Sequence, residues 1–129
     1  MGVRESVLIT IKQKAARAHP LEACGLLLGS ANLIAQVTVC ANIHATPHSR
    51  FEIDPAALIA AHRRARAGGP QVAGYWHSHP TGAALPSPTD QASASGDGRI
   101  WAIVAGDAVS FWRDGHGGFE ALSTRVVAG

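Results

Sequence analysis

The chain of 129 residues has little charge, few cysteines and no long apolar run, and each shortage excludes a class of protein. Charged residues make up only 16% of the chain and apolar residues 47%, a balance that favours a folded core over disorder. No apolar run approaches the roughly 18 residues that a membrane-spanning helix requires. The N-terminal segment carries charges throughout and lacks a small-residue cleavage site. We therefore expect no signal peptide, no membrane association and a cytoplasmic location.

The two cysteines, Cys24 and Cys40, are too few for a disulfide scaffold, and neither has a CxxC partner. We expect both to be thiols in a reducing compartment, which also excludes a cysteine-rich zinc site. The net charge of +2 is weak. A cluster of arginines at Arg63, Arg64 and Arg66 has no aromatic interleaving, which favours a solvated helix face and predicts no nucleic-acid partner. The chain has no internal repeats or linkers, and residues 1–129 are predicted to form a single domain.

Apolar periodicity and terminal signals predict three helices. The first covers residues 3–18, with Val7 and Ile11 on its apolar face. The second begins with Asp54 as N-cap and Pro55 at the first helical position, and it ends at Gly68–Gly69. The third is short and runs from Ser87-Pro88 to about residue 95.

Short apolar or alternating runs predict six strands between these helices. Turns are expected near residues 30–32, at Gly106-Asp107 and at Asp114-Gly115. Residues 42–54 are predicted to be a loop that includes a short strand at 50–53. This order of elements predicts an α/β domain in which a mixed sheet packs between helices. The six predicted strands cover residues 24–29, 33–41, 71–77, 99–105, 108–113 and 118–127.

Seven histidines are many for this length and invite a search for metal ligands. His77 and His79 stand at i and i+2 at the end of a predicted strand, so both imidazoles point the same way. Asp90 follows in the first turn of the next predicted helix and can reach back over the strand end. Two imidazoles and one carboxylate form a known catalytic zinc set that leaves the fourth position for water.

Hydrolysis also requires a base and a donor to the oxyanion. Glu22 precedes a predicted buried strand, where partial desolvation would tune its pKa toward the working range. Ser87 can donate its hydroxyl to the oxyanion of a tetrahedral intermediate. A structural interpretation competes with this one, because Ser87, Pro88 and Asp90 also read as a helix start close to a capping box. Glu22 alone could likewise be an exposed charge. The remaining histidines are interpreted as surface or core residues, with His48 the strongest candidate among them.

Taken together, Glu22, His77-Ser78-His79-Pro80, Ser87 and Asp90 closely resemble the signature of the JAMM (MPN+) metalloprotease family. The signature consists of a glutamate, then H-S/T-H-P, and then S-x-x-D after about six residues. The segments HPLEACGLLLG and RFEIDPAAL resemble small bacterial members of that family, and the resemblance covers the whole chain.

The resemblance implies an MPN fold, a mixed and partly closed sheet flanked by helices and similar to cytidine deaminase. It implies one zinc ion held by His77, His79 and Asp90, with Glu22 as general base and Ser87 as oxyanion donor. It also implies hydrolysis of peptide or isopeptide bonds after the C-terminal glycines of ubiquitin-like proteins. The chain has no room for the long insertions of eukaryotic deubiquitinating members. The expected partner is therefore a sulfur-carrier protein with a Gly-Gly tail.

Two other interpretations of the sequence compete with this one. A non-catalytic MPN module could serve as a scaffold for partner proteins, but such modules lack the metal ligands that this sequence keeps. A zinc deaminase needs H-x-E with P-C-x-x-C, and neither motif is present. HExxH is absent as well. The metalloprotease interpretation is therefore preferred.

Overall fold

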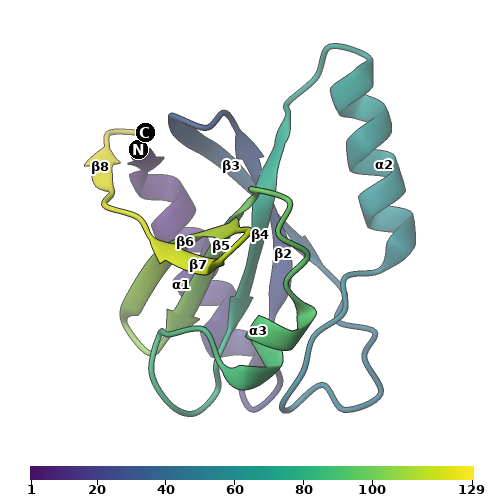
Figure 1. Cartoon of the computed structure of the whole chain (residues 1–129), viewed down its shortest axis with the longest axis vertical. Coiled ribbons are helices and arrows are strands. Elements are labelled where there is room, and N and C mark those ends of the chain that lie inside the picture. The colour runs from purple at the N-terminus through teal and green to yellow at the C-terminus, as the bar shows by residue number, and fades with distance from the viewer.

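The computed structural model describes residues 1–129, which form one mixed sheet with helices on both faces (Figure 1). The helices are α1 (Glu5–Ala18), α2 (Pro55–Arg66) and α3 (Pro88–Ser93). The eight strands are β1 (Gly2–Arg4), β2 (Cys24–Gly29), β3 (Leu33–Cys40), β4 (Val72–Ser78), β5 (Ile100–Ala105), β6 (Ala108–Gly115), β7 (Gly118–Ala121) and β8 (Arg125–Val127).

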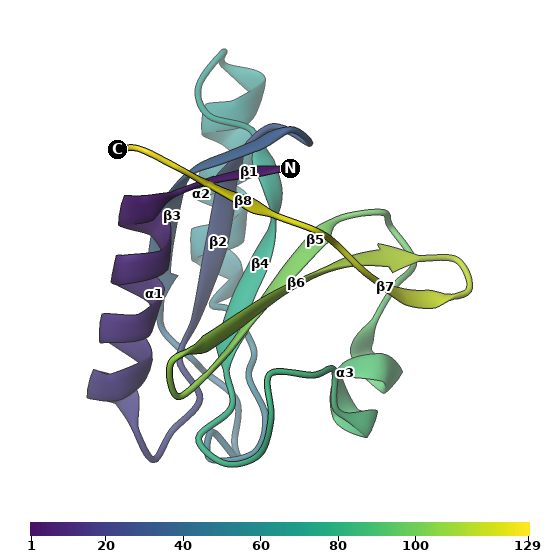
Figure 2. The same ribbon diagram turned by 90° about the vertical axis from the view of Figure 1, so that its left-hand side faces the viewer.

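The sheet is mixed and strongly curled. Its strand order is β7-β6-β5-β4-β2-β3-β1-β8, with parallel pairing of β4 to β5 and of β1 to both β3 and β8. The edge strands β7 and β8 are consecutive in the chain and are joined only by residues 122–124. The two edges of the sheet must therefore approach each other, and Figure 2 shows the chain crossing from β7 to β8 above the curled β5–β6 pair. This confirms the predicted α/β class with a partly closed mixed sheet.

Each face of the sheet has its own apolar core. Val7 and Ile11 of α1 pack on one face against a cluster that includes Leu27 and Trp76. On the other face, Ala61 of α2 joins a smaller cluster with Leu26 of β2. Because side chains alternate along a strand, β4 sends Trp76 into the α1 core and the next residue toward the opposite face. That next residue is His77, one of the predicted metal ligands.

Glycine makes the close packing beside β4 possible. Gly25 pairs with Trp76 across the β2–β4 ladder, and the Trp76 indole N–H donates to the carbonyl of Thr38 at 2.9 Å. A Cβ at Gly25 would collide with that same carbonyl and with the indole nitrogen. The glycine therefore lets the indole lie across β2, which fixes the strand that carries the histidines.

Several predicted boundaries were wrong in instructive ways. The N-terminal helix begins at Glu5, because residues 2–4 form β1 instead. The predicted strand at 50–53 reduces to one isolated bridge between Asn42 and Ile53. The predicted last strand is split into β7 and β8, and Asp114-Gly115 lies inside β6 instead of forming a turn. The remaining strands agree with their predicted bounds to within two residues.

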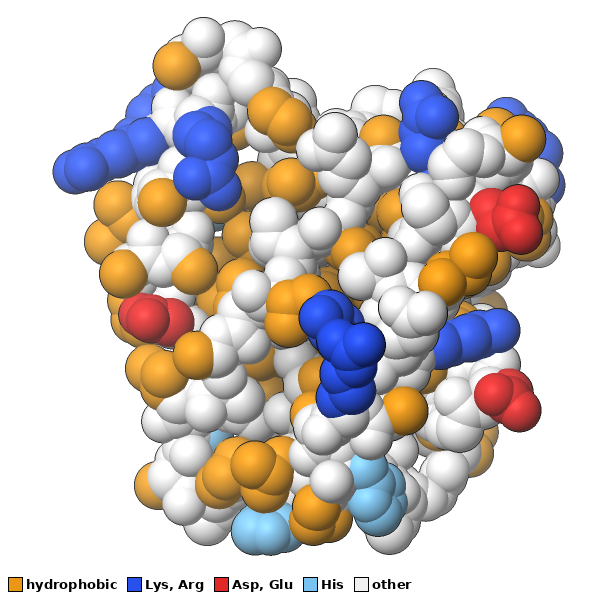
Figure 3. All heavy atoms as spheres, turned by 180° about the vertical axis from the view of Figure 1, so that it is seen from behind, with side chains coloured by type: hydrophobic (Ala, Val, Ile, Leu, Met, Phe, Trp, Pro, Cys, Tyr) orange, Lys and Arg blue, Asp and Glu red, His pale blue; other side chains and the backbone are white.

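The surface of α2 agrees with the solvated interpretation of its arginines. Asp54 caps the helix by accepting the N–H of Ala56, as predicted, and Arg63, Arg64 and Arg66 are exposed at the opposite end. Figure 3 shows Lys and Arg side chains projecting from that corner, with apolar side chains scattered over the rest of the face. No helix of the structure is both long enough and apolar enough to cross a membrane.

Candidate metal and catalytic site

His77 is buried at the end of β4 and is held by aromatic neighbours. Its side chain has no solvent exposure, and the Phe51 ring stacks on it with centroids 4.4 Å apart and planes inclined by 16°. Trp101 of β5 contacts the imidazole edge-on. Nδ1 of His77 has no hydrogen-bond partner, so packing holds the ring in place. Nε2 is left to face the site.

Ser78 links the histidine strand to the segment that carries Glu22. Its N–H donates to the carbonyl of Ala23 at 3.0 Å, and its hydroxyl accepts the N–H of Ala23 at 2.8 Å. In a regular antiparallel pair the second bond would go to the backbone carbonyl of Ser78. The hydroxyl takes over that role and ties the two segments together at the point where β4 ends.

His79 lies just beyond the strand and has a hydrogen bond that orients it. Its backbone N–H donates to the carbonyl of Val104 in β5 at 2.8 Å. On the ring, Nδ1 lies 2.9 Å from the carbonyl oxygen of Ala83, which can only accept, so Nδ1 carries the proton. A ligand histidine usually fixes its tautomer in this way, which directs the lone pair of Nε2 toward the metal.

Asp90 is the only buried residue of α3, and its carboxylate takes part in a helix cap and also contacts the two histidines. Oδ2 accepts the N–H of Ser87 at 2.9 Å, while Ser87 Oγ accepts the N–H of Asp90 at 3.0 Å, which completes the capping box. The same carboxylate also reaches the two histidines. The capping box therefore does not compete with a ligand role; it aims the carboxylate at the imidazoles.

The three side chains converge on one point. Oδ1 of Asp90 lies 3.1 Å from Nε2 of His77, Oδ2 lies 3.0 Å from Nε2 of His79, and the two Nε2 atoms are 3.1 Å apart. Ligands at zinc–ligand bond lengths of about 2.0–2.1 Å in a tetrahedron are separated by roughly 3.3 Å. A small expansion of the cluster would thus accommodate a zinc ion, and two imidazoles with one carboxylate are a ligand set that zinc uses in proteins.

The electrostatics of the cluster also favour a cation at its centre. Burial acts to raise the pKa of Asp90, but hydrogen bonds from His77 and His79 outweigh burial and hold that pKa well below its ordinary range. The hydrogen bond to Asp90 raises the pKa of His79, whereas burial lowers the pKa of His77. The Asp90 carboxylate thus stays charged, and either a proton on His79 or a bound metal ion balances its negative charge.

Glu22 is buried beside this cluster, with 7% of its surface exposed. Its backbone is fixed from both sides, because its N–H donates to the carbonyl of Pro47 and its carbonyl accepts from Asn42 Nδ2. Its carboxylate has no hydrogen-bond partner in the chain. Burial raises the pKa of Glu22 to about 7, against the opposing charge of His79. A carboxyl group with this pKa can both accept and release a proton near neutral pH.

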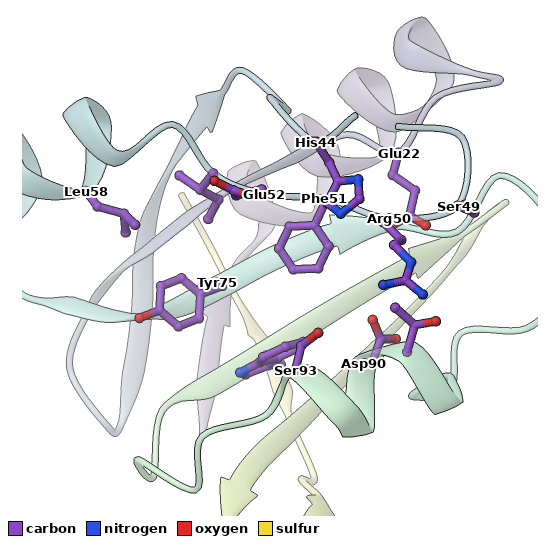
Figure 4. Close-up of a pocket in the computed structure, with 13 residues that line it drawn as sticks. Glu22, His44, Ser49, Arg50, Phe51, Glu52, Leu58, Tyr75, Asp90 and Ser93 are labelled. Atoms are coloured by element: carbon purple, nitrogen blue, oxygen red, sulfur yellow. The ribbon is translucent and has the colours of Figure 1, made fainter. Parts of the chain in front are cut away.

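Two adjoining cavities open onto the cluster. The larger, of about 400 Å³, has Glu22 and Asp90 at one end and Leu58 and Tyr75 toward the other, and Trp101 also lines it. Figure 4 shows Glu22 and Asp90 entering this cavity from opposite walls, the first from the segment before β2 and the second from α3. The smaller cavity, of about 210 Å³, is lined by Glu22, His79 and Ser87 among others. Every predicted catalytic residue therefore faces the space next to the cluster.

Sequence reasoning missed most of the cavity wall. Phe51 and Arg50 come from the loop before α2, and Figure 4 shows the Arg50 side chain pointing from that loop toward α3. The absence of periodicity over residues 42–54 was the one available signal, since a long structureless loop often carries function. His48 does line the smaller cavity, as its loop position suggested. His44 lines the larger cavity, although the sequence predicts only a surface or core residue there.

Cys24 is not part of the cluster. Its buried thiol donates weakly toward the carbonyls of Cys40 and Ala41, and burial raises its pKa to about 12. A thiol with that pKa remains protonated at neutral pH, and the group of side chains that could hold a metal ion consists of His77, His79 and Asp90 without a cysteine. Cys24 and Cys40 are neighbours across β2 and β3, and both are free thiols, as expected.

Two imidazoles and a carboxylate around one point, with a desolvated glutamate beside them, define a divalent-metal site of the kind that hydrolases use. Residues 4–115 match the family described as prokaryotic homologs of the JAB domain, and the chain belongs to that family.

Known relatives agree with this membership, and a solved structure has the same fold. The chain is 31% identical to the desampylase of Haloferax volcanii over 106 residues, which cover 81% of this chain and 76% of that protein. It is 36% identical over 74 residues to a probable TtuB-protein conjugate cleaving protease of Thermus thermophilus, covering 57% of this chain and 49% of that protein. The crystal structure of a JAB1/MPN domain protein from Archaeoglobus fulgidus superimposes with a TM-score of 0.69 at 22% identity, covering 98% of this chain and 99% of that one. The last likeness confirms the expected fold.

Proposed function

We propose that this chain is a zinc-dependent hydrolase that cleaves the peptide or isopeptide bond after the Gly-Gly tail of a ubiquitin-like protein of the sulfur-carrier type. The observation that carries the proposal is the convergence of His77, His79 and Asp90 beside the desolvated carboxyl of Glu22. Two relatives, a desampylase and a probable TtuB-protein conjugate cleaving protease, support the enzyme class and the kind of substrate.

The metal would be held by Nε2 of His77, Nε2 of His79 and the carboxylate of Asp90. These atoms lie within 4.8 Å of one another and come from two rigidly held segments. Zinc, when bound, supplies Lewis acidity that activates water and polarises the scissile carbonyl. The chain itself contributes the orientation of the ligands, through Ala83 for His79 and through the capping box for Asp90.

Glu22 is proposed to be the general base. Its pKa of about 7 in the metal-free chain lies where a carboxylate can take a proton from the attacking water and return it to the leaving amine. The absence of any hydrogen-bond partner leaves both carboxylate oxygens free for this exchange. Ser78 contributes by tying the Glu22 segment to the histidine strand, so that base and ligands keep a fixed separation.

Ser87 is proposed to stabilise the oxyanion. Its Oγ accepts the backbone N–H of Asp90, and this bond leaves the hydroxyl proton free to donate. The hydroxyl lines the smaller cavity together with Glu22 and His79, next to the position where a carbonyl would be attacked. A preorganised donor at such a position stabilises the charge that develops in the transition state.

The two cavities suit a thin extended chain that passes the cluster. A Gly-Gly tail lacks side chains and can approach the ligands closely, and extended peptides bind readily along sheet edges and loops. The end of the larger cavity with Leu58 and Tyr75 would hold a bulkier residue of the substrate.

We also propose that residues 1–129 act as one domain and in the cytoplasm, where a sulfur-carrier partner and the free thiols Cys24 and Cys40 would coexist.

The direct test is to incubate zinc-loaded protein with carrier proteins extended beyond Gly-Gly by a peptide bond or an isopeptide bond. Intact-mass measurement should show a product that ends at the second glycine, and the Glu22→Gln variant should give none. Zinc bound in full with no cleavage of any such substrate would instead support a non-catalytic scaffold. The same experiment with tails that end in Ala-Ala measures whether the glycines are read.

A further inference from the structure

Asp90 lies on α3, and the contacts that α3 makes are too few to hold this helix in place by themselves. α3 has only six residues, and Asp90 is the only one of them that is buried. Helices this short are unstable alone, so their position is set by packing or by their ends. The N-terminal end is fixed by the capping box of Ser87. The C-terminal end must be fixed by the segment that follows, because burial of α3 is too small to do so.

Asp114 of β6 holds that following segment. Its Oδ2 accepts the N–H of Ser95 at 3.0 Å and its Oδ1 accepts the N–H of Gly96 at 3.1 Å. Its backbone adds two more bonds, donating to the carbonyl of Arg99 at 2.9 Å and accepting the N–H of Gly98 at 2.8 Å. One residue therefore anchors the chain from residue 95 to residue 99 against the sheet.

The chemistry of Asp114 suits this anchoring role. The residue is 1% exposed, and no cationic side chain pairs with it, so the two backbone N–H groups are the partners of its carboxylate. Such charge-assisted bonds are stronger than neutral ones, and a buried carboxylate left without them would be costly. Gly96 has a φ of +70°, a conformation that lets successive N–H groups turn toward one carboxylate and that side-chain-bearing residues rarely adopt.

We propose that Asp114 is a positioning residue for the metal site, which acts through the segment at 95–96 and through α3 to hold the Asp90 carboxylate over the two imidazoles. Asp114 lies outside the sequence signature of the site, and its side chain touches none of the ligands. The inference rests on the proposed metal site. Partners that hydrogen-bond directly to metal ligands typically contribute about ten- to hundredfold to metal affinity, and an anchor that acts through α3 is expected at the lower end of that range.

The test measures the zinc affinity of the full chain by competition with a chelator. Asp114→Ala should weaken zinc binding by about tenfold, and Asp114→Asn should lose less affinity because its amide oxygen can still accept one N–H. Asp97→Ala is the matched control, since Asp97 is exposed and holds the same segment by accepting the N–H of Arg99 and pairing with its guanidinium, but makes no hydrogen bond to Asp114. Its affinity should stay within about twofold of the unaltered chain.

A second measurement does not depend on any variant folding. Coupling between sites is reciprocal, so zinc should slow hydrogen exchange at the amides of Ser95 and Gly96 in the unaltered protein. Unchanged exchange at both amides, or Asp114→Asn binding zinc as tightly as the unaltered chain, would overturn the inference. An unaltered chain that binds no zinc would instead overturn the proposed function, so the two failures can be told apart.

Discussion

Replacing Glu22 by Gln should make the metal-free protein more stable while abolishing its activity. The physical reason is the cost of an ionised carboxylate in a desolvated position. Burial raises the pKa of Glu22 from an ordinary 4.5 to about 7, so the folded chain holds that proton more tightly than the unfolded chain does. The protonated Glu22 therefore makes its full contribution to stability at pH values below its pKa in the unfolded chain. This contribution is lost as the pH rises through about 7.

The magnitude follows from the difference between the two pKa values. At about 1.4 kcal/mol for each pH unit, ionisation of Glu22 opposes folding by roughly 3 kcal/mol at pH 8 and by well under about 1 kcal/mol at pH 4.5. Gln is neutral at both values and has nearly the same shape. The free energy of unfolding of the Glu22→Gln variant should thus exceed that of the unaltered chain by about 3 kcal/mol at pH 8 and nearly equal it at pH 4.5.

The assay is urea unfolding of both proteins at the two pH values with a chelator present, because a bound cation would itself lower the pKa of Glu22. Glu120→Gln, which removes an exposed carboxylate from β7, is the matched control and should show no such gain. Turnover of the zinc-loaded proteins is measured in parallel. Equal stability of Glu22→Gln and the unaltered chain at pH 8, or substantial residual turnover, would refute the reasoning.

Four further outcomes are expected. Asp90→Ala should reduce zinc from about one ion per chain to near zero by elemental analysis, since a ligand is lost; stoichiometric zinc would leave Asp90 a capping residue only. Zinc affinity should fall as the pH is lowered from about 8 to about 6, because the hydrogen bond to Asp90 raises the pKa of His79, and that ring must lose its proton to bind an ion. An affinity independent of pH would contradict this. Ser87→Ala should lower kcat by about 10²–10³ even at zinc concentrations that fill the site, where the loss of the capping bond to Asp90 no longer limits metal binding; an unchanged kcat would remove the oxyanion role. Gly25→Ala should lower the melting temperature sharply, since the new methyl group would collide with the Thr38 carbonyl; normal melting would show that β2 can shift.

The spacing of the site residues could be read from the sequence because it depends on local geometry. Residues at i and i+2 of a strand must point the same way, and a Ser-Pro-x-Asp helix start must bring its carboxylate back to its own N-terminus. His77, His79 and Asp90 follow these rules. The two interpretations of Asp90, as cap or as ligand, appeared as alternatives only because the sequence does not show that one carboxylate has enough oxygens for both.

The features that the sequence did not reveal depend on distant pairing. β1 has three residues and exists because β3 and β8 flank it, which no local pattern indicates. Asp114-Gly115 has the composition of a hairpin turn, yet pairing with β7 draws it into β6. Stacking of Phe51 on His77 joins a loop to a strand that follows it by 26 positions, and only the folded chain brings them together.

The proposed hydrolysis requires one metal ion bound among His77, His79 and Asp90. The most direct test is a crystal structure of the zinc-loaded protein with anomalous diffraction recorded at the zinc absorption edge. We expect a single anomalous peak about 2.0–2.2 Å from both Nε2 atoms and from an Asp90 oxygen, with Glu22 facing the open side of the ion. A peak at another place, or full zinc loading with no peak among these three side chains, would contradict the account.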